Sequence, residues 1–133
     1  MWNYFEESEN DGFKVHDIFV RKENNFIQGF YYDASAESFV ESTGLYGQSK
    51  VQWLKQDPDD DRILEIDDSV SPYDLDKSLF GEGLCPRNEE EFVVLTWKEK
   101  KIIVLDRETL ELKEEFVMPE EAAQGWGITA VET

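Results

Sequence analysis

A short motif that recurs three times constrains the fold of this chain more than any other feature. In each copy a glutamine or glutamate stands directly before a glycine, and the glycine is followed by a bulky apolar residue. The glutamine or glutamate positions are 54 and then 42 residues apart. Four-stranded units that recur about every 40 to 55 residues are typical of β-propeller blades, so the spacing predicts successive blades. The three positions are Gln28, Glu82 and Gln124.

The segments between the copies are predicted to form short strands separated by polar turns, because they are rich in β-branched and aromatic residues. We expect one blade at residues 26–66, a second at 80–117 and the first strand of another at 124–133. A leading strand is expected at 13–20, after an N-terminal tail at 1–12. No segment shows a sustained helical period, so the predicted fold class is all-β, a partial β-propeller. A β-sandwich is the alternative, although it gives no reason for the motif to return in each cycle.

The length of the chain bears on how such a ring would close. A closed propeller has about four to eight blades, whereas these 133 residues supply two blades and flanking strands. We therefore expect the chain to be part of a longer ring, with closure through other copies as the alternative. Because unpaired sheet edges readily accept strands from other chains, self-association through open edges is one expected form of partnership.

The charge of the chain argues against several classes of partner. With 13 Lys and Arg against 31 Asp and Glu, the net charge is -18, which repels phosphate backbones and anionic lipid. No nucleic-acid or membrane partner is expected, and peptides with a free amino terminus fit this charge better. The first residues are acidic and lack the basic flank and apolar core of a signal peptide. The chain as written is therefore expected to be cytoplasmic.

Glu82 is the copy of the motif that we expect to carry chemistry. The first strand of every blade lines the axis of a propeller, so the three copies should converge there together with Trp126. A carboxyl among aromatic side chains has its ionised form disfavoured and its pKa raised, which suits a general acid. The residues alone favour a plainer interpretation, in which backbone N–H groups in a turn satisfy Glu82 and each glycine only lets backbones crowd together.

Metal and cofactor chemistry is not predicted. His16 is the only histidine and Cys85 the only cysteine, which leaves no cysteine-based metal site and no internal disulfide. We interpret His16 as an ordinary strand residue. The acidic run at 57–61 lacks the glycine and downstream glutamate of a calcium-binding loop, so we interpret it as a solvated hairpin tip.

Five segments of the chain are informative when taken together and in order: residues 26–30, 40–49, 80–84, 95–99 and 124–129. They resemble the glutaminyl-peptide cyclotransferases of the plant and bacterial type, the glutamine cyclotransferase family. The resemblance covers residues 13–129 but only the first half of a family member. It implies a five-bladed propeller and an acyltransferase that cyclises the N-terminal glutamine of peptides or proteins to pyroglutamate, releasing ammonia without a metal or other cofactor.

The same resemblance implies roles for individual residues. Glu82 looks like the proton donor and shuttle of the reaction, and Gln28 would bind polar groups of the substrate. The family usually has a glutamate where this chain has Gln124, so a charged role is not carried over to that position. The aromatic pocket, whose low polarity would raise the pKa of the acid, would be formed by Phe26, Phe80, Trp97 and Trp126.

Two further interpretations stay open at the level of sequence. Later blades, which in the family add a tryptophan and a lysine to the pocket, are missing from these residues, and this argues against activity of the short chain by itself. The chain would then be a non-catalytic propeller fragment that binds peptides or another protein through its aromatic mouth. The other interpretation is a truncated product without a function of its own.

Overall fold

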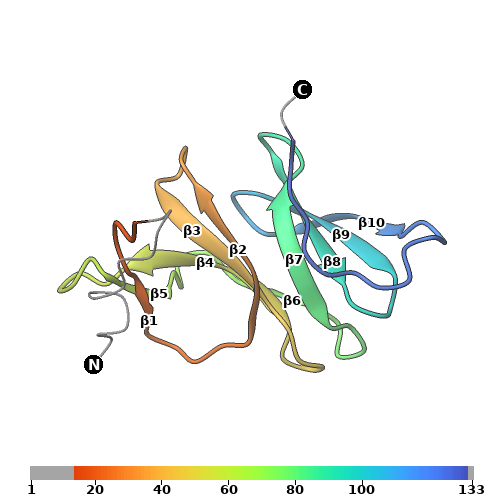
Figure 1. Ribbon diagram of the computed structural model, residues 1–133, viewed down its shortest axis with the longest axis horizontal. Coiled ribbons are helices and arrows are strands. Elements are labelled where there is room, and N and C mark those ends of the chain that lie inside the picture. The colour runs from red at the N-terminus through yellow and green to blue at the C-terminus, as the bar shows by residue number, and fades with distance from the viewer. Residues whose placement is uncertain (1–13, 132–133) are drawn as a thin grey trace.

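The computed structural model describes residues 14–131, and this part of the chain folds into two β-sheets (Figure 1). No helix long and apolar enough to span a membrane occurs within it. The first sheet comprises β1 (Val20–Arg21), β2 (Ile27–Asp33), β3 (Ser38–Thr43), β4 (Lys50–Gln56), β5 (Ile63–Ile66) and β6 (Tyr73–Asp74). The second comprises β7 (Gly81–Pro86), β8 (Glu91–Thr96), β9 (Lys101–Asp106) and β10 (Leu112–Val117).

The strands β2 to β5 form an antiparallel unit, which we call blade 1. β1 extends it by parallel pairing with β5, and the short β6 pairs with β4. Arg21 on β1 forms an ion pair with Glu41 on β3 (2.8 Å). Glu41 is fully buried and also accepts a hydrogen bond from Gln52 Nε2 (2.7 Å). This network ties the segment before β2 to blade 1.

The strands β7 to β10 form a second antiparallel unit, blade 2. The hydrophobic core lies between the two blades and excludes water from both sheets. Burial of a side chain as large as that of Phe92, which is fully buried, stabilises a fold by roughly 1.5–3 kcal/mol. Blade 1 contributes Val40, Val51 and Trp53 to this core, and blade 2 contributes Leu84, Phe92, Val94, Ile103 and Leu105.

Acidic residues form many of the turns between strands. Asp33 Oδ1 accepts hydrogen bonds from the backbone of Ser35 and Ala36 (2.9 and 3.2 Å), an arrangement that favours a tight reversal. The acidic run at 57–61 is the hairpin tip between β4 and β5, as expected, and Asp57 accepts a hydrogen bond from the backbone of Asp59 (2.8 Å). Part of the acidic charge of the chain therefore shapes its turns.

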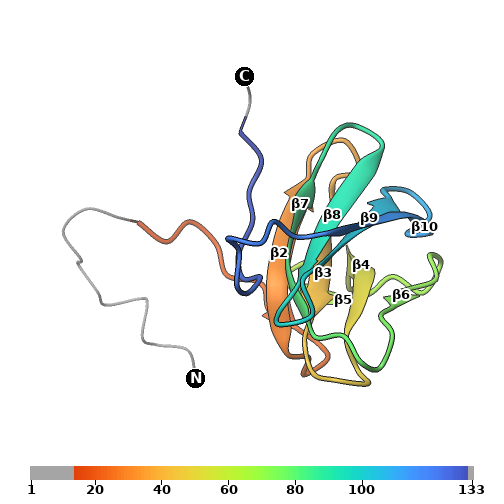
Figure 2. The same ribbon diagram turned by 90° about the vertical axis from the view of Figure 1, so that its right-hand side faces the viewer.

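The innermost strands of the two blades lie side by side, as Figures 1 and 2 show for β2 and β7. Residues 124–131 lie against β7, where Gly83 N donates a hydrogen bond to Trp126 O (2.9 Å). The first two copies of the recurring motif therefore lie on neighbouring inner strands, and the third lies in the segment beside β7. Two four-stranded units, blades 1 and 2, that meet in this way form a partial β-propeller, which confirms the predicted fold class.

Two of the expected strands differ from the structure. The leading strand expected at 13–20 is limited to β1, because the described residues before Val20 are exposed and pair with no strand. The strand expected at 124–133 is absent over 124–131, which contact their neighbours through isolated hydrogen bonds rather than a ladder. The expected tail at 1–12, and residues 132–133, lie outside the described residues.

Candidate functional site

Two of the three motif copies coincide with β-bulges at the start of an inner strand. In β2, Ile27 pairs with Thr43 and Gly29 pairs with Ser42, so Gln28 is the extra residue. In β7, Gly81 pairs with Thr96 and Leu84 pairs with Val94, so Glu82 and Gly83 together face a single residue. A bulge redirects a side chain relative to a regular strand and is frequent beside active sites. The repeated motif therefore places Gln28 and Glu82 at equivalent bulges.

Glycine is required in these bulges because the inner strands approach one another closely. A Cβ atom added to Gly29 would lie 2.6 Å from Leu84 N, and one added to Gly83 would lie 2.7 Å from Trp126 O. Gly29 thus faces Leu84, which follows Gly83, and Gly83 faces Trp126, which follows Gly125. This regular contact explains why glycine recurs in the motif, and it supports the structural interpretation of the glycines given above.

An aromatic cluster surrounds the start of β7, with Phe80 at its centre. The Phe80 ring lies edge-on to Phe26, Tyr46 and Trp97, with ring centroids 6.1, 5.4 and 5.4 Å apart. Trp97 in turn packs against Trp126 at 6.0 Å. Such tilted and edge-to-face arrangements are the favoured geometries for aromatic pairs. The cluster joins residues from both blades and from the segment 124–131.

The exposure of the cluster changes from its centre to its edges. Phe80 and Trp97 are half-buried, whereas 52% of Phe26 and 57% of Trp126 is exposed. Gln28 is half-buried. It lies beside Phe80, because a Cβ atom added to Gly44 would be 3.2 Å from Gln28 Cγ and 2.7 Å from Phe80 Cζ. An aromatic surface with a partly open rim is suited to holding the apolar part of a small ligand.

Glu82 is the buried acid of this region. Only 3% of the residue is exposed, although it is charged at neutral pH in water. Burial, and to a smaller extent the negative charge of Glu99, raises the pKa of Glu82 above its ordinary value. Within residues 14–131 no group donates a hydrogen bond to its carboxyl, while its backbone carbonyl accepts one from Ser42 Oγ (2.5 Å). Glu82 is therefore placed to hold and release a proton.

One hydrogen bond and one cation–π contact hold the Trp97 side chain at the edge of the cluster. Trp97 Nε1 donates to Gln124 Oε1 (3.0 Å), so the third copy of the motif orients an indole ring. Lys98 Nζ lies 4.0 Å from the centroid of the Trp97 ring, within the range of a cation–π interaction. Gln124 itself is exposed, whereas Gln28 is half-buried and Glu82 is buried.

All six residues expected from the sequence to form the site lie in or next to this region, on the inner strands and the segments that adjoin them. Sequence reasoning missed the roles of three others, Tyr46, Glu99 and Gln124. Tyr46 and Glu99 lie within segments that carry the family resemblance, but only the fold shows that they reach Phe80. The six expected residues are Phe26, Gln28, Phe80, Glu82, Trp97 and Trp126.

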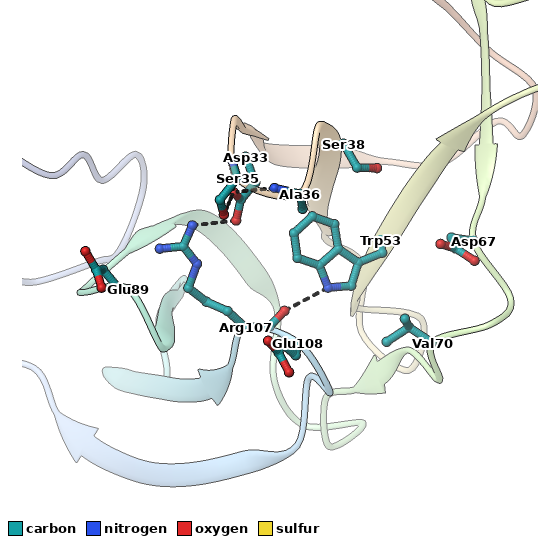
Figure 3. Close-up of a pocket in the computed structure, with 10 residues that line it drawn as sticks. All are labelled: Asp33, Ser35, Ala36, Ser38, Trp53, Asp67, Val70, Glu89, Arg107 and Glu108. Atoms are coloured by element: carbon teal, nitrogen blue, oxygen red, sulfur yellow. Dashed lines mark hydrogen bonds and ion pairs between the residues drawn. The ribbon is translucent and has the colours of Figure 1, made fainter.

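A separate cavity of about 390 Å³ opens between the blades at the opposite end of β2 (Figure 3). Arg107 forms an ion pair with Asp33 there, and its backbone carbonyl accepts a hydrogen bond from Trp53 Nε1 (2.9 Å). Burial alone would raise the pKa of Asp33, but hydrogen bonds from Ser35 and Arg107 lower it. These polar groups satisfy one another, so we interpret this region as a clamp between the blades.

The described residues contain no cluster of three or more histidine, cysteine, aspartate or glutamate side chains arranged to hold a metal ion. Glu82 is a buried carboxyl two residues after Phe80, the centre of the aromatic cluster. A carboxyl of this kind can donate a proton to a reacting group or accept one from it.

Comparison with known proteins places this geometry in a family. The family model described as glutamine cyclotransferase matches residues 3–133. Among solved structures, the chain is similar to the glutaminyl cyclase of Myxococcus xanthus, with 20% identity and a TM-score of 0.58. The match covers 86% of this chain and 42% of that chain, so the chain spans less than half the length of that protein. No curated protein matches the chain. The chain belongs to the glutamine cyclotransferase family.

Proposed function

We propose that this chain carries the proton-transfer part of a glutaminyl-peptide cyclotransferase, which converts the N-terminal glutamine of peptides or proteins to pyroglutamate and releases ammonia. The observation that carries the proposal is the Glu82 carboxyl, which is 3% exposed, has a raised pKa and adjoins the aromatic cluster. Membership of the glutamine cyclotransferase family supports the choice of reaction.

The proposed reaction is an internal exchange of amides within the substrate. The free α-amine attacks the side-chain carboxamide carbon, forming a new C–N bond and a tetrahedral intermediate. The C–N bond to the carboxamide nitrogen then breaks, and that nitrogen must gain a proton to leave as ammonia. Protonated Glu82 donates this proton and recovers one from the attacking amine, so the residue is unchanged after each turnover. Proton relay of this kind contributes roughly 10²- to 10⁴-fold in rate.

The remaining residues of the site hold the substrate in a folded conformer. Ring closure requires the amine and the carboxamide carbon to approach within contact distance, and fixing such a pair removes much of the entropic cost. Phe80 and Trp97 would pack against the aliphatic part of the glutamine side chain, and Gln28 would bind its polar groups. The same aromatic surface lowers the local polarity, which favours the protonated form of Glu82.

We further propose that the reaction needs no metal ion. The nucleophile is supplied by the substrate, and a single protonated carboxyl provides the proton that the leaving group requires. Ammonia release should therefore be unchanged after the protein has been dialysed against a chelator. Loss of activity on chelation, with recovery on addition of a divalent metal, would show that the mechanism is incomplete.

A second function is favoured by the open rim of the site. Phe26 and Trp126 are more than half exposed, and the chain spans 42% of the similar Myxococcus xanthus protein. The alternative is a module that binds peptide amino termini without turning them over. It predicts saturable binding of a Gln-initiated peptide with no ammonia release, and weaker binding after Trp97→Ala.

Both functions are tested by one experiment. A peptide that begins with glutamine is incubated with the chain, and ammonia and the pyroglutamyl product are measured together. The cyclase proposal predicts product formation that falls about 10²- to 10⁴-fold in Glu82→Gln and is unchanged in Glu111→Gln, a matched removal of one exposed carboxylate. Equal activity in the two variants would remove Glu82 from the mechanism, and binding without product would favour the alternative.

A further inference from the structure

We propose that Glu99 is a positioning residue of the site, which ties three segments together around Phe80 and places a negative charge beside Glu82. Glu99 lies in the turn between β8 and β9 and has no role in the reaction as described above. Its importance for catalysis rests on the proposed function, but its contacts can be measured without a substrate.

Both carboxylate oxygens of Glu99 accept hydrogen bonds. Oε1 accepts from Phe80 N (2.6 Å), and Oε2 accepts from Lys98 N (3.0 Å) and Tyr46 Oη (3.2 Å). Burial and the charge of Glu99 raise the pKa of Tyr46, so its hydroxyl remains a donor. Hydrogen bonds to a charged acceptor are about twice as strong as neutral ones. Glu99 thus connects a loop of blade 1 to the β8–β9 turn and to the start of β7.

The backbone that Glu99 holds leads directly to the bulge that carries Glu82. Phe80 lies two positions before Glu82. Besides the hydrogen bond that its amide donates to Glu99, its carbonyl accepts one from Trp97 N (3.0 Å). Phe80 is therefore held at both its amide N–H, by the side chain of Glu99, and its carbonyl, by the backbone of Trp97. Because Phe80 is also the centre of the aromatic cluster, a shift of Glu99 would move the acid and the rings together.

Among the residues that the structure describes, Glu99 is the one whose charge raises the pKa of Glu82. The elements packed against β7 are β2, β3, β8 and residues 124–131. Their charged groups are neutralised by ion pairs: Asp33 by Arg107, Glu41 by Arg21, and Glu91 by Arg87 and Lys113. Residues 124–131 contain no charged side chain.

A second carboxylate beside a buried acid has a defined consequence. Two nearby carboxyl groups resist being ionised together, so the negative charge of one disfavours ionisation of the other. Glu99 accepts three hydrogen bonds and Glu82 accepts none at its carboxyl within the described residues. Glu99 therefore supports the protonated form of Glu82.

The two effects of Glu99 are separated by two substitutions. Glu99→Gln removes the charge but keeps an oxygen that can accept from Phe80 N, whereas Glu99→Ala removes both. Glu111→Gln is the matched control, because it removes one carboxylate from the exposed turn between β9 and β10. The readouts are the titration of the Glu82 carboxyl, followed by carbon NMR, and hydrogen exchange of the Phe80 amide.

The inference predicts that Glu99→Gln lowers the pKa of Glu82 while largely keeping protection of the Phe80 amide, and that Glu99→Ala loses both. If Glu99→Ala does not fold, the Glu99→Gln titration alone decides the charge effect. An unchanged Glu82 titration in Glu99→Gln, equal to that in Glu111→Gln, would overturn the inference. These readouts need no turnover, so a failure of the cyclase proposal leaves them intact. If ammonia is released, Glu99→Gln should also move the alkaline limb of the pH profile to lower pH.

Discussion

A buried glutamate is costly unless it keeps its proton, and this single residue links the stability of the chain to its proposed chemistry. Glu82 follows a glycine in a bulge, has no ion-pair partner among residues 14–131 and is almost fully enclosed. Its raised pKa means that ionisation is less favourable in the folded chain than in the unfolded chain. The property that suits Glu82 to proton transfer therefore reduces the stability of the fold at neutral pH.

Replacement of Glu82 by glutamine should stabilise the chain in a pH-dependent way. The folded state binds the Glu82 proton more tightly than the unfolded state, so wild-type stability falls as the pH rises from the ordinary glutamate pKa through the raised one. Glu82→Gln removes this loss. Thermal unfolding should show a higher midpoint for the variant than for wild type near neutral pH, and no such gain in acid. A variant that is less stable than wild type at neutral pH would contradict this account.

The sequence predicted the acid and its aromatic neighbours but not the contacts that hold them. The recurring glycine and the family resemblance indicated Glu82, Phe80 and Trp97. The hydrogen bonds from Phe80 N and Tyr46 Oη to Glu99 depend on how two turns approach β7. Residues 46, 80 and 99 are far apart in the chain, so local pattern gives no signal of their meeting.

At the scale of strands, the sequence was most informative where a segment has partners on both sides. β3 and β9, which each pair with a strand on both sides, lie within the blades expected at 26–66 and 80–117, and their apolar residues fill core positions. The segment at 13–20 has the same composition, yet its described part is a strand only at β1. Composition reports that a segment can form a strand, whereas pairing requires a neighbour, which the local sequence does not supply.

The contact between β7 and residues 124–131 gives a test of how the inner strands pack. An added methyl group at Gly83 would lie 2.7 Å from Trp126 O and 3.0 Å from Gly127 Cα, both of them backbone atoms. Gly83→Ala should therefore displace this segment and destabilise the chain by about 1–3 kcal/mol. Gly127→Ala is the control, since nothing lies within 4 Å of an added Cβ there. Denaturant unfolding of the two variants measures the difference, and equal stabilities would show that the close approach is absent.

The clamp between the blades gives a second test at this scale. The side chains of Arg107 and Asp33 are 13% and 4% exposed, so Arg107→Ala leaves an almost fully buried carboxylate without its ion-pair partner. Loss of one partner from a buried pair costs roughly 3–5 kcal/mol. Denaturant unfolding should show a loss of this order for Arg107→Ala, and partial recovery when Asp33→Asn is added. A cost below about 1 kcal/mol would mean that water already solvates the pair.

Across the whole molecule, equivalent positions of the two blades have different environments. Leu84 and Phe92 of blade 2 are buried against blade 1, whereas 47% of Phe30, which occupies the place of Leu84 in the repeat, is exposed. Blade 1 also replaces the apolar pair Val94 and Ile103 by Glu41 and Gln52, which bond to each other. The two blades therefore share a backbone arrangement, whereas the side chains at equivalent positions differ with what each blade packs against.

The sequence predicted the propeller spacing because glycine recurs at the positions where the inner strands approach one another closely. That spacing predicted successive blades, and the described residues form two β-sheets that share one hydrophobic core. What links fold to function is the position of Glu82 where β2, β7 and residues 124–131 come together. The protonation of this one carboxyl in the folded chain is therefore the quantity on which the proposed mechanism depends.

Titration of the Glu82 carboxyl in the unmodified chain measures that quantity directly. The resonance can be followed by carbon NMR as a function of pH and assigned by its loss in Glu82→Gln. The account predicts a midpoint above the ordinary value for glutamate, which is about 4.3 in peptides. A midpoint at or below that value would show that Glu82 is an ordinary ionised carboxylate and would contradict its role as the proton donor.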